Sequence, residues 1–427
     1  MVFSGSGAGT SGDPYQITNW EQLQEVNDEL DAYYILMNDL DENTSDYSTY
    51  ASDTANAGAG WVPIGDDSTP FLGSFDGQNF TISDLFINRP TTERQGLFGQ
   101  VGTLDSSSTG TIKNITLSNF DITTGQVGGC LAGAIRDRNA EKVVLVENVH
   151  VIDSSIIFSI HIFEDFLVFL GGLIGLSECK VISCSAINTV VNANNTATTR
   201  DVRVVGGLIG GVQGGLVEKC FAKGCSVYAD FEYGGLVGRL LSTDDVGDVT
   251  VRNCFSDCTL FDSISSGSNN GVCGGFTGSM IHGTGSTMLV DKCYSLSDIS
   301  NASDGSLFNR NVFLNRGTLI RTNNFSLDDG VSISPGATIK TESEMKDRDT
   351  FTDTTTDGLD EAWDMAETNT YDDTKIWGIG LNGFDNTNDG YPYLTSLVTE
   401  SIPITTFPAT NISLTTVTLN GEVEYLE

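Results

Sequence analysis

The stretch VVGGLIGGVQGGLVEKC at residues 204–220 decides the fold, because glycine pairs alternate in it with aliphatic residues. Such a run is typical of a phosphate-binding loop, a membrane segment or the turns of a repeat. A phosphate-binding loop needs a Lys-Ser or Lys-Thr ending, or a strand followed by a helix and a later acidic residue. The stretch lacks both contexts, which favours a repeat.

Six segments of the chain align with one another without gaps. They start at residues 112, 146, 181, 217, 251 and 290, so successive starts lie 34, 35, 36, 34 and 39 residues apart. Their sequences are IKNITLSNFDIT, VENVHVIDSSII, VISCSAINTVVN, VEKCFAKGCSVY, VRNCFSDCTLFD and VDKCYSLSDISN. A spacing this regular predicts stacked structural units.

A glycine-rich phrase separates these segments. It reads GLFG at residue 96, GGCLAG at 128, GGLIG at 171 and 206, GGLVG at 234 and GGFTG at 274. Each repeat therefore holds one alternating strand and one short aliphatic strand, and no Asn-Gly hairpin joins neighbouring strands. This pattern favours a parallel β-solenoid over a β-sandwich.

The solenoid predicts which repeated positions face inward and which form corners. The fourth position of the aligned segments is always small or medium-sized and apolar: Ile115, Val149, Cys184, Cys220, Cys254 and Cys293. We expect these residues to form an inward column, with successive turns about 4.8 Å apart. We expect the sharp corners or close contacts at glycines, namely Gly207, Gly215, Gly235 and Gly275.

The phrases GGLIG, GGLVG and GLFG resemble the GLUG motif, which occurs in tandem in bacterial and archaeal surface proteins. The opening GDPYQITNWEQLQEVNDELDAYYILMNDLD and the later KTESEMKD, IWGIG and DGYPYL are similar to the beginning and end of GLUG-type β-helix domains. The match spans residues 12–394. It implies a right-handed parallel β-helix displayed outside the cell, and it attaches no catalytic residues to the motif.

The expected organisation has four parts. Residues 1–95 form an N-terminal cap and the first turns, residues 96–315 the GLUG-type repeats, and residues 316–400 the last turns and a C-terminal cap. Within residues 401–427, ATNISLTTVTLNGEV resembles the first two strands of a fibronectin type III-like domain. The expected fold class is all-β: a right-handed parallel β-helix with capped ends and a partial β-sandwich segment at the C-terminus.

The predicted caps consist of one helix and large aromatic side chains. Residues 19–30 form an amphipathic pattern that begins with an Asn N-cap and a Gln three residues later, close to a capping box. Four tryptophans lie in the two flanking regions: Trp20, Trp61, Trp363 and Trp377. We expect them to cover the terminal turns of the solenoid, where open strand edges need protection.

The charge of the chain excludes some partners. The chain has 427 residues, with 57 acidic and 21 basic side chains and a net charge of −36, which disfavours nucleic acid and anionic membranes. The apolar stretch at residues 149–176 is interrupted by charged residues, so we interpret it as buried strands and expect no membrane insertion. Residues 1–12 contain no secretory signal, which favours a virion protein over a secreted one.

Nine cysteines raise the question of bridges or metal sites. No pair has the two-residue spacing of a zinc ribbon. Neighbours in the inward column, such as Cys220 and Cys254, lie close enough for a disulfide if their side chains point suitably. The preferred alternative is a column of reduced thiols that act as small apolar groups.

One candidate calcium site follows the repeats, and no other cofactor is expected. The string DNTNDG at residues 385–390 places oxygen ligands at Asp385, Asn386, Thr387 and Asp389. Ser396 stands at the twelfth position of this loop, where an EF-hand has glutamate. No pair of acidic residues stands out by its repeat position as a catalytic pair.

The preferred function is a non-enzymatic surface protein for attachment or recognition. We expect it on a cell surface or on a virion, for example in a tail fibre, with a surface glycan or a host receptor as partner. Neighbouring copies or other structural proteins are further expected partners, including an oligomer. Two alternatives stay open: a carbohydrate-active enzyme such as a polysaccharide lyase or glycosidase, and a structural spacer or sheath component.

Overall fold

The computed structural model describes residues 3–104, 110–137, 144–159, 167–193, 202–262, 272–302, 305–306, 309–313, 318–328, 334–368, 372–379 and 388–397. Residues 1–397 form one compact unit. The predicted fibronectin-like segment at residues 401–427 lies outside the described residues.

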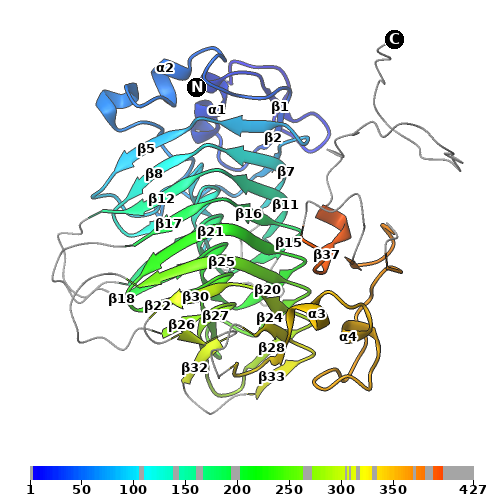
Figure 1. Cartoon of the computed structure of the whole chain (residues 1–427). Coiled ribbons are helices and arrows are strands. Elements are labelled where there is room, and N and C mark those ends of the chain that lie inside the picture. Colours follow the sequence, from blue (N-terminus) through cyan, green and yellow to red (C-terminus); the bar gives the residue numbers. More distant parts are fainter. Residues whose placement is uncertain are drawn as a thin grey trace, which may run out of the picture. The chain divides into compact units, whose positions relative to one another are not determined.

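The chain coils into a parallel β-solenoid, as predicted (Figure 1). Its largest sheet has 22 strands, and each pairs in parallel with strands of the preceding or following turn. The strands of this sheet are β1 (Tyr15–Ile17), β2 (Tyr33–Leu36), β3 (Ser74–Asp76), β4 (Thr81–Ser83), β5 (Phe86–Arg89), β7 (Thr111–Ser118), β8 (Asp121–Thr124), β11 (Leu145–Ile152), β12 (Ser155–Phe158), β15 (Lys180–Ile182), β16 (Ser185–Ile187), β17 (Val190–Asn192), β20 (Gly215–Glu218), β21 (Phe221–Ala229), β24 (Val249–Arg252), β25 (Phe255–Asp262), β28 (Thr287–Asp291), β29 (Tyr294–Ser295), β30 (Asp298–Asn301), β33 (Thr318–Thr322), β34 (Phe325–Leu327) and β35 (Thr338–Lys340).

Two further parallel sheets complete the turns. The six-stranded sheet contains β9 (Val127–Gly128), β13 (Leu167–Gly171), β18 (Val202–Gly206), β22 (Glu232–Gly234), β26 (Val272–Gly274) and β31 (Gly305–Ser306). The seven-stranded sheet contains β6 (Phe98–Val101), β10 (Ala132–Ile135), β14 (Ile174–Ser177), β19 (Ile209–Gln213), β23 (Val237–Ser242), β27 (Thr277–His282) and β32 (Asn309–Phe313). The glycine-rich phrases join these two sheets.

The stretch at residues 204–220 traces about half of one turn. It covers the end of β18, a bend, β19, a second bend at Gly214, and β20. Cys220 follows β20 and points into the core, where its exposed fraction is 0%. The glycine phrase therefore forms bends between strands of a coil, and not a phosphate-binding loop.

Gly207 lies in the bend between β18 and β19, where neighbouring turns approach closely. An added Cβ at Gly207 would lie 2.2 Å from the carbonyl oxygen of Gly235, and one at Gly235 would lie 2.1 Å from that of Gly275. Gly207 and Gly235 do not have positive φ, so close approach and not backbone conformation requires glycine there. Gly215 does need its conformational freedom, because its φ is +100°.

Left-handed corners outside the glycine phrases form two further columns, one through seven turns and one through five. The residue before the inward column has φ between 53° and 55° in seven successive turns: Asn114, Asn148, Ser183, Lys219, Asn253, Lys292 and Asn323. A second left-handed column consists of Asp84, Asn119, Asp153, Asn188 and Gly224. Asn and Asp tolerate this conformation better than other non-glycine residues. Assigning the corners to glycines alone therefore missed these two columns of corners, in which Gly224 is the only glycine.

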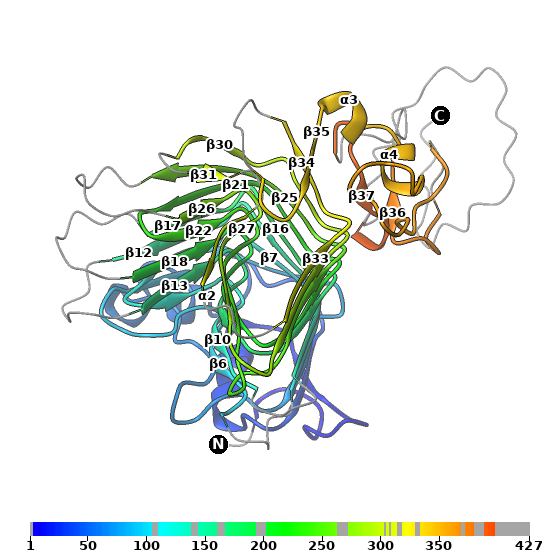
Figure 2. The same cartoon turned by 90° about the horizontal axis from the view of Figure 1, so that it is seen from below.

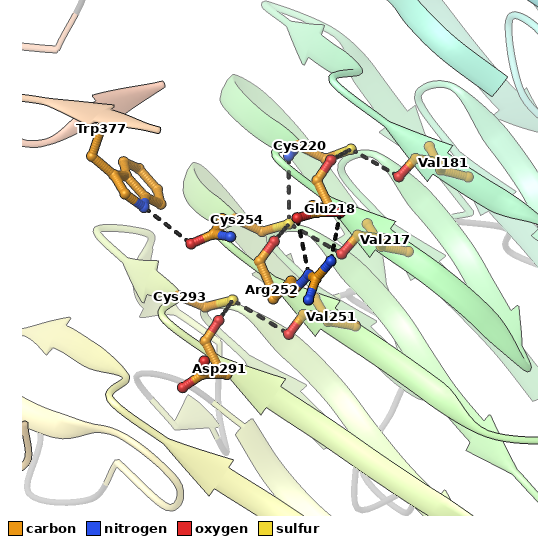
Figure 3. A network of polar contacts seen from close by, with 11 residues as sticks. Val181, Val217, Glu218, Cys220, Val251, Arg252, Cys254, Asp291, Cys293 and Trp377 are labelled. Carbon is orange, nitrogen blue, oxygen red and sulfur yellow. Dashed lines mark hydrogen bonds and ion pairs between the residues drawn. The ribbon is translucent and has the colours of Figure 1, made fainter. Parts of the chain in front are cut away.

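The six residues of the inward column are all buried: Ile115, Val149, Cys184, Cys220, Cys254 and Cys293. Consecutive members are in contact, since the backbone N–H of Cys184 donates to Cys220 Sγ at 3.4 Å and that of Cys220 to Cys254 Sγ at 3.4 Å. Each thiol in turn donates to a backbone carbonyl, for example Cys220 Sγ to Glu218 O at 3.2 Å (Figure 3). All nine cysteines are free and buried, which agrees with a column of reduced thiols.

The last turn replaces apolar members of the inner columns by polar ones. Arg321 on β33 pairs with Val290, whose side chain is fully buried. Asn324 continues the thiol column, because its Oδ1 accepts the N–H of Cys293 at 3.0 Å. Apolar contact continues beside them, since Leu319, Ala337 and Ile339 pack against the core.

The N-terminal cap is a short helix over the first turns (Figure 1). Helix α1 (Trp20–Glu25) continues into the 3-10 helix η1 (Val26–Asp28), and the buried Trp20 packs on Trp61 at a ring distance of 6.0 Å. The side chain of Asn19 accepts the N–H of Gln22 at 2.9 Å, which is the predicted N-cap. The short helices α2 (Tyr47–Tyr50) and η2 (Ala55–Gly58) lie in the same region.

The C-terminal segment packs beside the coil (Figure 2). It contains α3 (Glu342–Met345), α4 (Asp349–Thr352), η3 (Thr395–Leu397) and a small antiparallel sheet of β36 (Trp377–Gly378) and β37 (Tyr393–Leu394). Trp377 Nε1 donates to Asn253 Oδ1 at 3.3 Å, and Trp363 Nε1 to Asn323 O at 3.2 Å. Trp363 also packs on Phe325 at a ring distance of 6.0 Å, so it lies against the last turn, as expected. Trp377 instead lies against the left-handed corner of an earlier turn, on the side of the coil.

Candidate functional site

Two outward-facing surfaces of the large sheet carry aromatic side chains, and they differ in exposure. The first is a column of Phe221, Phe255, Tyr294 and Phe325, which strand register aligns in successive turns. The rings of Phe255 and Tyr294 stack at 5.0 Å, and Trp377 lies 5.8 Å from Tyr294. This aromatic column is the surface on which the C-terminal segment packs, so it is already occupied.

The second surface, the outer strip, comprises the outward side chains of β8, β12, β17, β21 and β25. Its residues are Asp121, Thr123, Ser155, Ile157, Val190, Asn192, Ser226, Tyr228, Thr259 and Phe261. They alternate with fully buried residues such as Ile156 and Val227, as expected for strands with one face in the core.

Apolar side chains remain accessible on the outer strip. The exposed fractions of Ile157 and Val190 are 37% and 36%. Tyr228 and Phe261 are half-buried, and their rings stack at 4.5 Å with an angle of 9°. The strip thus combines apolar contact area with hydroxyl and amide groups, a mixture typical of binding surfaces.

A groove with a volume of about 400 Å³ opens where the outer strip meets the second left-handed corner. Its lining residues, which we call the corner groove, are Asn119, Phe120, Asp121, Asp153, Ser154, Ser155, Asn188 and Val190. The corner contributes three of these residues, Asn119, Asp153 and Asn188, whose φ lies between 50° and 55°. The lining holds two carboxylates and no Lys, Arg or His.

Sequence reasoning missed the corner groove, although the aligned segments contain a signal for it. Their eighth residue is Asn119, Asp153 and Asn188 in three successive repeats. Within this column the Asn119 amide donates to Asp84 Oδ1 at 2.7 Å, and the Asn188 amide to Asp153 Oδ1 at 3.1 Å. The alternation of Asp and Asn avoids the stacking of like charges in neighbouring turns.

A chain of serine, histidine and asparagine on β11 and β16 has the polar contacts of a hydrolytic triad. His150 Nδ1 lies 2.9 Å from Ser185 Oγ, and His150 Nε2 lies 3.0 Å from Asn148 Oδ1. Burial lowers the pKa of His150 to about 4, so its imidazole is neutral at pH 7. Ser185 has an exposed fraction of 1%, so its hydroxyl does not face a substrate. The contact with Ser185 joins adjacent turns and the one with Asn148 lies within β11, so both are structural hydrogen bonds of the coil.

The predicted calcium loop lies mostly outside the described residues, which include neither Asp385, Asn386 nor Thr387. Asp389 is described and exposed. Its neighbour Asn388 is buried, donates to the Tyr294 hydroxyl at 2.6 Å and accepts from Lys223 Nζ at 3.2 Å. The described end of the loop therefore attaches the C-terminal segment to the coil. Among the described residues, no three His, Cys, Asp or Glu side chains gather in a metal-binding arrangement.

The four cysteines of the thiol column are fully buried and closed to solvent. Burial raises the pKa of the Cys184 and Cys254 thiols well above their usual value, and it does the same for Cys258 outside the column. A buried protonated thiol reacts slowly, because the thiolate is the nucleophile. The predicted structural residues of this column therefore stabilise the core.

No protein-family profile matches the chain. Two relatives match parts of it. Halomucin from Haloquadratum walsbyi is 30% identical over 197 residues, which are 43% of this chain and 2% of Halomucin. A protein from Evansella cellulosilytica, provisionally named a Gly-rich membrane protein, is 33% identical over 140 residues, which are 32% of this chain and 14% of that protein.

A crystal structure from Bacteroides ovatus, provisionally named an immunoglobulin A1 protease, is similar in fold. The TM-score is 0.51 and the sequence identity 17%, with 91% of this chain and 94% of that chain covered. A likeness at this identity shows the fold alone. None of the helices in the described part of the chain is long and apolar enough to span a membrane.

Proposed function

We propose that the protein is a surface-displayed recognition module that binds its partner through the outer strip, without catalysis. The main support for this proposal is that Ile157, Val190 and the Tyr228–Phe261 stack stay accessible on the outer strip, beside a polar groove. The comparable aromatic column on the neighbouring side is covered by the protein's own C-terminal segment. A rigid parallel sheet holds these side chains at fixed spacing, which lowers the entropic cost of binding.

Three properties support display outside the cell. The matched relatives include Halomucin and a protein named as a membrane protein. The acidic surface, with a net charge of −36, keeps an exposed protein soluble. The repeated GGLIG-type phrases, whose glycines occupy equivalent bends, fit the GLUG type of surface repeat. We extend the proposal to attachment to a glycan or receptor on a cell or virion surface.

The outer strip can be tested by changing its apolar side chains. The double variant Ile157→Ser/Tyr228→Ser should lose at least tenfold in binding of the fluorescently labelled protein to intact cells or isolated envelopes. The matched control is Tyr33→Ser/Ile320→Ser, which removes one tyrosine and one isoleucine that are 42% and 40% exposed outside the strip. Equal binding by both variants would refute the strip as the contact surface.

The enzymatic alternative has its own assay. The protein is incubated with a panel of neutral and acidic polysaccharides, and reducing ends and unsaturated products are measured. A pure recognition module releases neither. Product release at a catalytic rate that survives further purification would replace the proposal by a carbohydrate-active enzyme.

A further inference from the structure

The hydrogen-bond donors of the corner groove are largely used within the protein. The Asn119 amide donates to Asp84 and the Asn188 amide to Asp153, both along the corner column. The Ser155 hydroxyl donates to Asp121 Oδ1 at 2.9 Å, and the Ser154 hydroxyl to Ile152 O at 2.9 Å. Each amide keeps a second N–H, so the groove offers a ligand two amide donors beside its acceptors.

The acceptors of the same groove are in excess. An ionised carboxylate has about four acceptor positions, and an amide oxygen has two. Among the described residues, none donates to Oδ2 of Asp121 or Asp153, or to Oδ1 of Asn119 or Asn188. A ligand that fits this lining must supply donors.

The charge of the groove specifies the ligand further. Two carboxylates line it and no cationic side chain does, so the site attracts a positive group and repels an anionic one. Val190, which is 36% exposed, adds an apolar contact at the edge of the groove. A matching ligand therefore has hydroxyl donors, one positive charge and a C–H surface. An amino sugar has all three.

We propose that the corner groove binds an unacetylated hexosamine unit of a glycan chain, with the ammonium group between Asp121 and Asp153 and sugar hydroxyls on the amide oxygens. This inference rests on the proposed recognition function and names its ligand class. The polymer would continue along the outer strip, where successive turns lie about 4.8 Å apart. That repeat is close to the length of one sugar unit.

The test measures the affinity of a glucosamine trisaccharide by isothermal titration calorimetry, with the N-acetylated trisaccharide as the second ligand. We expect the glucosamine form to bind at least tenfold more tightly. The variant Asp121→Asn/Asp153→Asn should reduce its affinity at least tenfold, since charge-assisted hydrogen bonds are about twice as strong as neutral ones. Both substitutions keep an acceptor oxygen for Ser155 and Asn188, and Asn tolerates the φ of 50° at Asp153.

A control variant distinguishes the effect of the groove carboxylates on the affinity from the effect of the protein's overall negative charge. Asp31→Asn/Asp53→Asn removes the same charge from two exposed residues outside the groove and should change the affinity less than twofold. Equal losses in the two double variants would overturn the proposal, as would equal affinity for the acetylated trisaccharide. Binding of Ca²⁺ alone that depends on Asp121 and Asp153 and excludes the sugar would also overturn it, in favour of a cation site.

The recognition function and the hexosamine inference can be refuted independently of each other. If the glucosamine trisaccharide does not bind while the outer-strip variant still loses attachment, the hexosamine inference is wrong and the recognition function stands. If the outer-strip variant attaches normally, the recognition function is wrong.

Discussion

Replacing Gly207 with alanine should separate two turns of the solenoid. The new Cβ would lie 2.2 Å from the carbonyl oxygen of Gly235, 3.1 Å from Ala222 Cβ and 3.2 Å from Cys258 Sγ. A backbone oxygen cannot rotate away as a side chain does, so the backbone itself must shift. Overpacking a close-packed core costs about 1–3 kcal/mol. Because the nearest atom belongs to the backbone, we expect a loss of about 3 kcal/mol, at the upper end of that range.

Two other glycines provide controls for the steric argument. Gly12 has no heavy atom within 4 Å of an added Cβ, so Gly12→Ala should change stability by less than about 0.5 kcal/mol. Gly247 is equally open but has a φ of +85°, so Gly247→Ala isolates the backbone strain, about 1–2 kcal/mol. Urea unfolding followed by circular dichroism compares the three. Equal stability of Gly207→Ala and Gly12→Ala would refute the steric cost at Gly207.

Four further predictions concern thiols, charges and pH. Ellman's reagent should detect none of the nine buried thiols in the native protein and all of them in urea; native reactivity would contradict the closed core. Asn119→Asp should cost about 1 kcal/mol at pH 7, measured by urea unfolding, because it replaces the 2.7 Å bond to Asp84 by like charges; the loss should shrink at pH 4. The N–H groups of Thr69 and Ser68 hold the pKa of Asp66 below its ordinary value. This group therefore adds stability that is present above the ordinary carboxyl pKa and is lost as the pH falls through the lowered one, so in acid the wild type should lose more stability than Asp66→Asn. Raising salt from 0.1 to 1 M shortens the screening length from about 10 to 3 Å and should raise the Tm of this chain of net charge −36; a falling Tm would argue against charge repulsion.

Periodicity in the sequence predicted the parts of the fold that repeat in every turn. The thiol column follows from one aligned position, because parallel stacking places equivalent residues above one another. The left-handed corners were missed even though Asn114, Asn148 and Asn253 share the third position of the aligned segments. Asparagine at a repeated position indicates a left-handed backbone conformation as well as a polar side chain.

Features that depend on contacts between distant segments were not predictable from periodicity. The bond from Trp377 to Asn253 joins residues 124 positions apart, so no local pattern indicates that the C-terminal segment covers the side of the coil. The corner groove likewise needs three consecutive turns in register. The eighth position of the aligned segments indicates that Asn119, Asp153 and Asn188 form one column, but the groove also needs Asp121 and Val190 from two other positions.

The arginine at an inward position of the last turn disfavours end-to-end stacking of copies. Parallel β-strands template further strands, and an apolar final turn would recruit another copy of the coil. With Arg321 at an inward position, a second molecule docking there would have to bury a guanidinium against its own aliphatic residues, whereas the Asn324 amide is already buried and donates to Val290 O and Gly336 O. Arg321 thus disfavours end-to-end fibres of the coil.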